Sequence, residues 1–116
     1  MDRQLLGRKA EALAVAHLRK QGLRIEERNF RCRLGEIDLV ARDGATLVFV
    51  EVRSRTSAEF GLPEESVGHR KQQRLRRIAQ VYLQGRGETT IRFDVVSVRF
   101  DRQGNLQRIE HIPQAF

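Results

Sequence analysis

The feature that most constrains the fold is a pair of apolar runs joined by a tight turn. The runs EIDLVA (36–41) and TLVFVEVR (46–53) are rich in Val, Leu and Ile, and residues 42–45 separate them. Asp43 and Gly44 stand in this separating segment. An Asp-Gly pair between two β-type runs favours a two-residue hairpin turn. The sequence therefore predicts a β-hairpin over residues 36–53.

The register expected for this hairpin brings acidic side chains together. With Asp43 and Gly44 as the turn residues, Glu36 lies opposite Glu51 and Asp38 lies opposite Phe49. Because side chains alternate along a strand, one face carries Glu36, Asp38, Glu51 and Arg53, and the other carries Ile37, Leu39, Val48, Val50 and Val52. Opposed like charges destabilise a hairpin, so a divalent cation between Asp38 and Glu51 is expected to compensate them. Mg²⁺, or alternatively Mn²⁺, suits such oxygen ligands. The other interpretation is a solvent-exposed face of ion pairs.

The rest of the sequence predicts one α/β domain over residues 1–116. The expected elements are a helix over 3–21 that stops at Gly22, a strand over 23–33, the hairpin, a helix from about 64 to 84, and strands over 91–100 and 106–112. The order αβββαββ suits a mixed β-sheet flanked by helices, with the second helix crossing between two strands.

Two charged side chains fall among apolar residues of the expected helices. Glu11 stands four residues before Val15, so a third carboxylate could reach the hairpin from the first helix. Lys71 stands midway between Val67 and Leu75, on the expected buried side of the second helix. A lysine there needs an anion, unless its apolar stem extends past the edge of the core.

The charge of the chain points to a polyanionic partner. The formal net charge is +7, and nearly all of the positive charge comes from arginine. Arginine forks two hydrogen bonds onto phosphate oxygens, which makes nucleic acid the first candidate, although such a charge also aids solubility alone. Arg70, Arg74 and Arg77 form a stripe on the exposed side of the second helix, which serves either nucleic-acid binding or simple solvation.

Several classes of protein are disfavoured by the composition. There is no apolar run long enough to cross a membrane and no apolar segment of a secretion signal near the start, so we expect a cytoplasmic protein without membrane contact. Cys32 is the only cysteine, which excludes an internal disulfide and a cysteine-based metal site.

These motifs together resemble a known group of nucleases. An Asp, twelve intervening residues and Glu-Val-Arg, after a helix bearing Glu11, resemble the restriction-endonuclease-like PD-(D/E)XK superfamily, which includes Holliday-junction resolvases. The longer pattern RNFRCRLGEIDLVARDG, LVFVEVRSR, FGLPEESV, Lys71 and RFDVVSV is similar to the YraN-type family of small bacterial endonuclease-like proteins.

The resemblance implies a restriction-endonuclease-like fold and a metal-dependent endonuclease that hydrolyses phosphodiester bonds of DNA, with structured or branched DNA as candidate substrates. It assigns Glu11, Asp38 and Glu51 to the catalytic acids. It further implies that Asp38, Glu51 and the backbone carbonyl of Val52 bind Mg²⁺. Since two sites are needed to cut the paired strands of a junction, a homodimer is expected by the same analogy.

The chain departs from the superfamily pattern at two positions. Ile37 replaces the usual Pro, and Arg53 replaces the usual Lys. Arginine stays protonated, so Arg53 supplies a fixed charge rather than a base. Lys71 or Glu36 could act in its place, and Arg55 could share the phosphate. Two other functions stay open: a nucleic-acid-binding protein without turnover, and a protein-interaction scaffold on the same fold.

Overall fold

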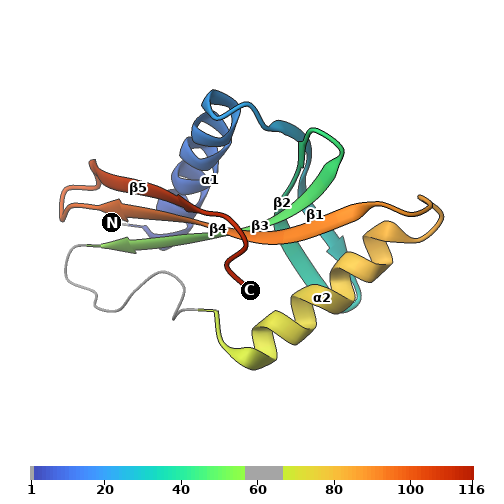
Figure 1. Ribbon diagram of the computed structural model, residues 1–116. Helices are drawn as coiled ribbons and strands as arrows, with labels where there is room; N and C mark the ends of the chain where they lie inside the picture. The colour runs from blue at the N-terminus through green and yellow to red at the C-terminus, as the bar shows by residue number, and fades with distance from the viewer. Residues whose placement is uncertain (1, 57–66) are drawn as a thin grey trace.

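The predicted α/β order is confirmed by a computed structural model that describes residues 2–56 and 67–116 (Figure 1). The elements are α1 (Arg3–Lys20), β1 (Arg24–Cys32), β2 (Gly35–Asp43), β3 (Thr46–Thr56), α2 (His69–Leu83), β4 (Thr90–Phe100) and β5 (Leu106–Ile112). The five strands that the described residues form make one sheet in the order β1-β2-β3-β4-β5. Only β3 and β4 pair in parallel, so α2 lies in the crossover that joins them. No helix in the described part of the chain is long and apolar enough to span a membrane.

The two helices cover opposite faces of the sheet, with α1 above and α2 below it in the view of Figure 1. Side chains alternate along the central strands, and each face therefore has its own core. The core on the α1 face includes Leu39, Val48, Val50, Val96 and Val98. The core on the α2 face includes Val40, Leu47, Phe49, Phe93 and Val95. A side chain on β3 is thus directed to one helix or to the other.

Helix α1 is set by its ends and by small residues on its buried side. The Asp2 carboxylate caps the first turn by accepting the N–H of Gln4 at 2.8 Å. The chain leaves the helix at Gly22, whose φ of 90° suits glycine. Ala10 and Ala14 are fully buried, which lets the helix backbone lie close to the sheet. Their neighbour Glu11 is consequently held near the strands.

Helix α2 begins later than the sequence predicted. It starts at His69, after Gly68 in an extended conformation, whereas the prediction began near residue 64. Val67 is buried ahead of the helix rather than within it. The predicted start near residue 64 and residues 60–66 of the FGLPEESV pattern lie outside the described residues.

The hairpin register differs from the predicted one by two residues. The last pair before the turn is Asp43 with Thr46, so Gly44 and Ala45 are the turn residues. Gly44 has a φ of 60°, and glycine at the first turn position is typical of a type II′ turn. The predicted pairings of Glu36 with Glu51 and of Asp38 with Phe49 are therefore wrong.

Beyond this hairpin the strands β2 and β3 separate. Their pairing runs only from Asp43 with Thr46 to Leu39 with Val50. Within the described residues, the distal part of β3 (residues 51–56) pairs only with β4, and Figure 1 shows it leaving with β4 and β5 while β1 and β2 turn away. The separation also moves Ile37 to the α2 face, although Leu39 stays on the α1 face as predicted.

Candidate functional site

A small cavity opens where β2 separates from β3 beneath α1. We call it the acid cavity; its volume is about 190 Å³, and it is lined by Gly7, Ala10 and Glu11 of α1, Asp38 of β2, and Val52 and Ser54 of β3. The close approach of α1 through Ala10 brings Glu11 to one wall. The unpaired stretch of β2 brings Asp38 to the other wall.

Asp38 is a half-buried acid held by the backbone of the neighbouring strand. Its Oδ2 accepts the N–H of Val52 at 2.8 Å. Burial raises the pKa of Asp38 to about 8, and a hydrogen bond with Glu51 and the charge of that carboxylate act in the same direction. The charge of Glu11 adds to this, while the Val52 N–H opposes it. Without a cation, Asp38 therefore holds a proton at neutral pH.

Glu51 approaches Asp38 from the α2 face of the sheet. The residue is only 7% exposed, and its Oε2 has no partner in hydrogen-bonding geometry among the described residues. The Lys71 ammonium lies 2.5 Å from that oxygen and compensates its charge as an ion pair. Lys71 therefore has an anionic partner, which was the first of the two explanations predicted for a lysine at this position. Asp38 and Glu51 together form an acid pair that has more lone pairs than donors.

Glu11 stands at the rim of the cavity rather than within the pair. Asn29 of β1 donates from its side-chain Nδ2 to Glu11 Oε1 at 3.0 Å, which fixes the carboxylate. In residues 2–56 and 67–116, no three or more His, Cys, Asp or Glu side chains are close enough to form a metal site. The predicted convergence is thus seen for Asp38 and Glu51, with Glu11 acting at longer range.

The acid pair nevertheless fits a magnesium site. Mg²⁺ usually takes one or two protein carboxylates and completes its shell with waters and substrate phosphate. The half-buried Asp38, whose pKa is raised, and the buried Glu51, whose Oε2 is met by Lys71 alone among the described residues, have the chemistry of such a donor set. For Val52, the structure places the backbone N–H against Asp38, and the role of its carbonyl as a ligand stays a prediction.

Other predicted residues lie around a second hollow beside the first. We call it the arginine hollow; it has a volume of about 570 Å³ and is lined by Arg3, Leu6, Arg53, Ser54, Arg55, Thr56, Asp101 and Arg102. Arg53 and Arg55 therefore line this hollow, and neither lines the acid cavity. Glu36 is exposed and pairs with Arg31 at 3.3 Å, away from the acid pair. Arg70, Arg74 and Arg77 are exposed on α2, as the stripe predicted.

Several residues that surround these sites could not be predicted from the sequence. Asn29 and Ser54 are ordinary polar residues of strands. Asn29 is distinguished locally by its backbone φ of 53°, which the sequence does not reveal. Arg3 and Arg102 come from opposite ends of the chain. No spacing rule links positions that only the tertiary fold brings together.

Comparison with known proteins identifies relatives along the full length of the chain. The sequence model of the uncharacterised protein family UPF0102, which is the YraN-type family, matches residues 10–98. The UPF0102 protein of Pelotomaculum thermopropionicum is 53% identical to this chain, over 98% of this chain and 97% of its own length. The UPF0102 protein of Moorella thermoacetica is 52% identical, over 100% of this chain and 98% of its own length. One from Anaeromyxobacter dehalogenans is 54% identical, over 98% of this chain and 85% of its own length.

Proposed function

The chain belongs to the uncharacterised protein family UPF0102, and we propose that it is a metal-dependent endonuclease that hydrolyses phosphodiester bonds of DNA, structured or branched DNA in particular. The observation that carries the proposal is the pairing of the half-buried Asp38 with the buried Glu51. Burying two carboxylates against each other costs stability, and only one lysine compensates them. A divalent cation removes that cost and supplies the chemistry of phosphodiester hydrolysis.

In this proposal the acid pair holds Mg²⁺ or Mn²⁺, and the Val52 carbonyl is a further ligand. When bound, the ion polarises the phosphate, lowers the pKa of a coordinated water and offsets charge on the leaving oxygen. The Val52 N–H fixes the orientation of Asp38. Glu11, fixed by Asn29, faces the cavity from α1 and adds negative potential that favours the cation.

The basic residues near the acids have separate roles in the proposal. Lys71 contacts Glu51 directly, so it is the cation nearest to the acid pair. When a metal takes the charge of Glu51, the Lys71 ammonium becomes available as a compact donor to the substrate. Arg53 lines the neighbouring hollow and supplies fixed positive charge there. In this proposal Lys71 takes the role of the lysine that the superfamily usually has at the position of Arg53.

The second candidate function is nucleic-acid binding without turnover. It is favoured by the placement of Arg53 outside the acid cavity and by the ion pair that Lys71 forms with Glu51. A lysine that satisfies the acid permanently would leave no site for a metal. A scaffold function on the same fold is the third candidate, and neither metal nor DNA binding is expected for it. A cytoplasmic location and a homodimer belong to the leading proposal as expectations.

Calorimetric titration of Mg²⁺ and Mn²⁺ tests the proposal, with Asp38→Asn beside the parent. Glu88→Gln is the control, because it removes an exposed carboxylate far from the acid cavity. The same samples are then incubated with branched and linear DNA. We expect metal binding and cleavage in the parent and the control, and neither in Asp38→Asn. Cleavage by Asp38→Asn at the parental rate would refute the site, and metal binding without cleavage would favour the second function.

A further inference from the structure

We propose that the arginine hollow binds a backbone phosphate of the same DNA strand that enters the acid cavity, next to the phosphate to be cleaved. The inference rests on the proposed function for the identity of the strand. The sequence pointed to the α2 stripe as the basic surface instead. Two arginines of the hollow, Arg3 and Arg102, belong to no nucleic-acid-binding motif that the sequence suggested.

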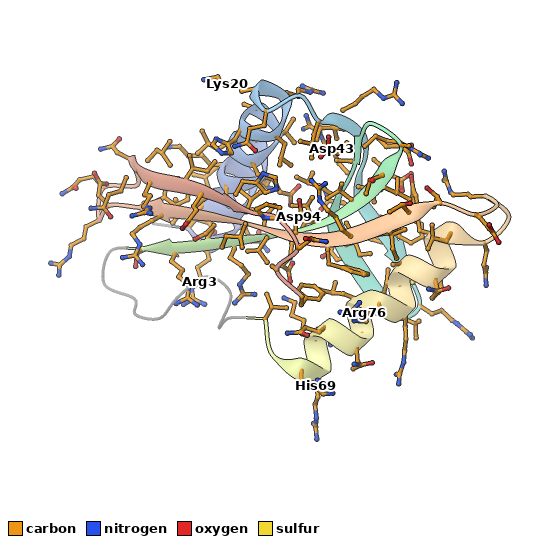
Figure 2. All side chains as sticks on the ribbon, viewed as in Figure 1. Arg3, Lys20, Asp43, His69, Arg76 and Asp94 are labelled. Carbon is orange, nitrogen blue, oxygen red and sulfur yellow. The ribbon has the colours of Figure 1, made fainter. Side chains whose placement is uncertain are left out.

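The hollow is formed by three segments that are distant in the chain. Arg3 comes from the first turn of α1, Arg53 and Arg55 come from the distal part of β3, and Arg102 comes from the turn between β4 and β5. Figure 2 shows Arg3 beside the distal part of β3. Four guanidinium groups therefore line one concave surface large enough for a phosphate and its sugar.

The described lining of the hollow carries four arginines and one carboxylate. Arg3, Arg53 and Arg102 form no ion pair within residues 2–56 and 67–116. The one carboxylate in the lining, Asp101, accepts the N–H groups of Gln103 and Asn105, both at 2.9 Å. Those bonds hold the β4–β5 turn together and keep the pKa of Asp101 below its usual value. Convergent like charges in a cleft raise the local concentration of anions, and guanidinium groups match phosphate oxygens in pairs.

The basic surface continues from the hollow across the sheet. Arg55 of β3 lies opposite Arg99 of β4, which in turn lies opposite Arg108 of β5. Directly opposed side chains point to the same face, and like charges in such pairs destabilise a sheet. Arg108 lies 3.8 Å from Glu110. A polyanion along this row would offset the repulsion.

The two cavities are adjacent, which links the hollow to the acid pair. Ser54 lines both cavities, and Val52 lies two residues before it on the same strand. Two residues of strand span about 7 Å. A single DNA strand that follows β3 would therefore bring consecutive phosphates to the acid cavity and to the hollow. The α2 stripe lines neither of the two cavities.

Fluorescence anisotropy with labelled DNA in EDTA tests the inference without any need for catalysis. The double variant Arg3→Gln/Arg102→Gln removes two exposed charges of the hollow. Arg19→Gln/Arg24→Gln is the matched control, because it removes two exposed arginines at the far end of α1 and in β1. Arg74→Gln/Arg77→Gln represents the α2 stripe. Thermal unfolding of each variant confirms that it is folded.

We expect the hollow variant to bind DNA at least tenfold more weakly, with a shallower dependence of affinity on salt because fewer counterions are released. The control is expected to bind within about twofold of the parent, which is the scale of a non-specific charge effect. A larger loss in the α2 variant, an equal loss in all three, or no DNA binding by the parent would each overturn the inference.

A further experiment distinguishes binding of a DNA strand from binding of free anions. Inorganic phosphate is titrated by calorimetry into the parent and the hollow variant. Phosphate binding that the variant loses, together with unchanged DNA binding, would show a site for small anions and overturn the inference. Asp38→Asn is expected to keep DNA binding in EDTA. If the parent binds DNA through the hollow but binds no metal, the proposed nuclease function fails while the phosphate site stands.

Discussion

Two acids of this sheet, Asp94 on β4 and Asp38 on β2, have opposite surroundings. Asp94 of β4 is fully buried, and each of its oxygens has partners: Arg92, His111 at 2.7 Å and the N–H of Gln114 at 3.0 Å (Figure 2). Burial alone would raise its pKa, but these hydrogen bonds outweigh burial and lower it. Burial raises the pKa of Asp38 as well, and there the neighbouring Glu51 adds to the effect.

The difference separates an acid that stabilises the fold from one that costs stability. Asp94 joins β4 to β5 and to the C-terminal residues by satisfied hydrogen bonds. His111 extends this network to α1, since its Nδ1 lies 2.6 Å from Gln21 Oε1. The contacts that Asp38 and Glu51 make within the fold could also be made by a side-chain amide in place of a carboxylate. Unfavourable electrostatics that persist in a well-packed protein point to a functional site.

The largest expected effect on the free energy of unfolding comes from removing Asp94, the acid whose hydrogen bonds are satisfied. Asp94→Ala leaves Arg92 and His111 without their buried partner, although Arg92 keeps its contact with Asp43 at 2.8 Å. Removing one member of a buried charged network costs about 3 to 5 kcal/mol of unfolding free energy. Urea unfolding measures it. A loss below about 1 kcal/mol would show that the Asp94 network is not structural.

Asp38→Asn is expected to change stability in the opposite direction. In EDTA at pH 8, the variant should gain about 1 to 3 kcal/mol of unfolding free energy, because an amide donates to Glu51 without needing a proton. Its carbonyl oxygen can still accept the Val52 N–H. Urea unfolding of the metal-free proteins gives the comparison. A destabilised variant would mean that the acid pair supports the fold as Asp94 does.

The stability of the metal-free parent is expected to fall as pH rises from about 5 to about 8. Folded Asp38 keeps its proton up to a pKa of about 8, whereas the unfolded chain releases it near 3.8. The folded state binds more protons in this window, so the free energy of unfolding decreases with pH and levels off above it. Urea unfolding at pH 5, 6.5 and 8.5 should show the fall in the parent and its absence in Asp38→Asn. Asp94, whose pKa is lowered, contributes stability above pH 4 that is lost in acid.

The sequence predicted the elements of both regions but not their contacts. The apolar runs, Gly22 and the Asp-Gly pair were enough to locate the helix α1 and the hairpin. The register failed because Gly44 takes the first turn position, and one turn position shifts every pairing by two residues. The separation of β2 from β3 after Leu39 has no local signal, yet it creates the acid cavity. Asp38 and Glu51 were chosen correctly as neighbours, although through a register that the structure does not have.

The role of Lys71 can be separated from that of the acid pair by Lys71→Gln. The Lys71 side chain is 31% exposed, so we expect its removal to cost only about 1 to 2 kcal/mol in EDTA, less than that of a member of a fully buried pair. Saturating Mg²⁺ should restore more stability to this variant than to the parent, since the ion no longer competes with Lys71 for Glu51. Thermal unfolding with and without Mg²⁺ measures both effects. Equal stabilisation of the two proteins by Mg²⁺ would contradict the competition.

The smallest expected effect is that of Glu36→Gln, and it distinguishes the two registers of the hairpin. In the predicted register Glu36 faces Glu51, and its neutralisation would relieve the acid pair as Asp38→Asn does. In the structure Glu36 is exposed and paired with the still more exposed Arg31. Such a surface pair contributes about 0.5 kcal/mol or less, so unfolding free energy and Mg²⁺ affinity should both stay at the parental value. Urea unfolding and calorimetry on this variant would show a gain in stability at pH 8 only if the acidic side chains met through the predicted pairing. An unchanged Glu36→Gln beside a stabilised Asp38→Asn therefore places the electrostatic cost in the gap between β2 and β3, and not along the hairpin.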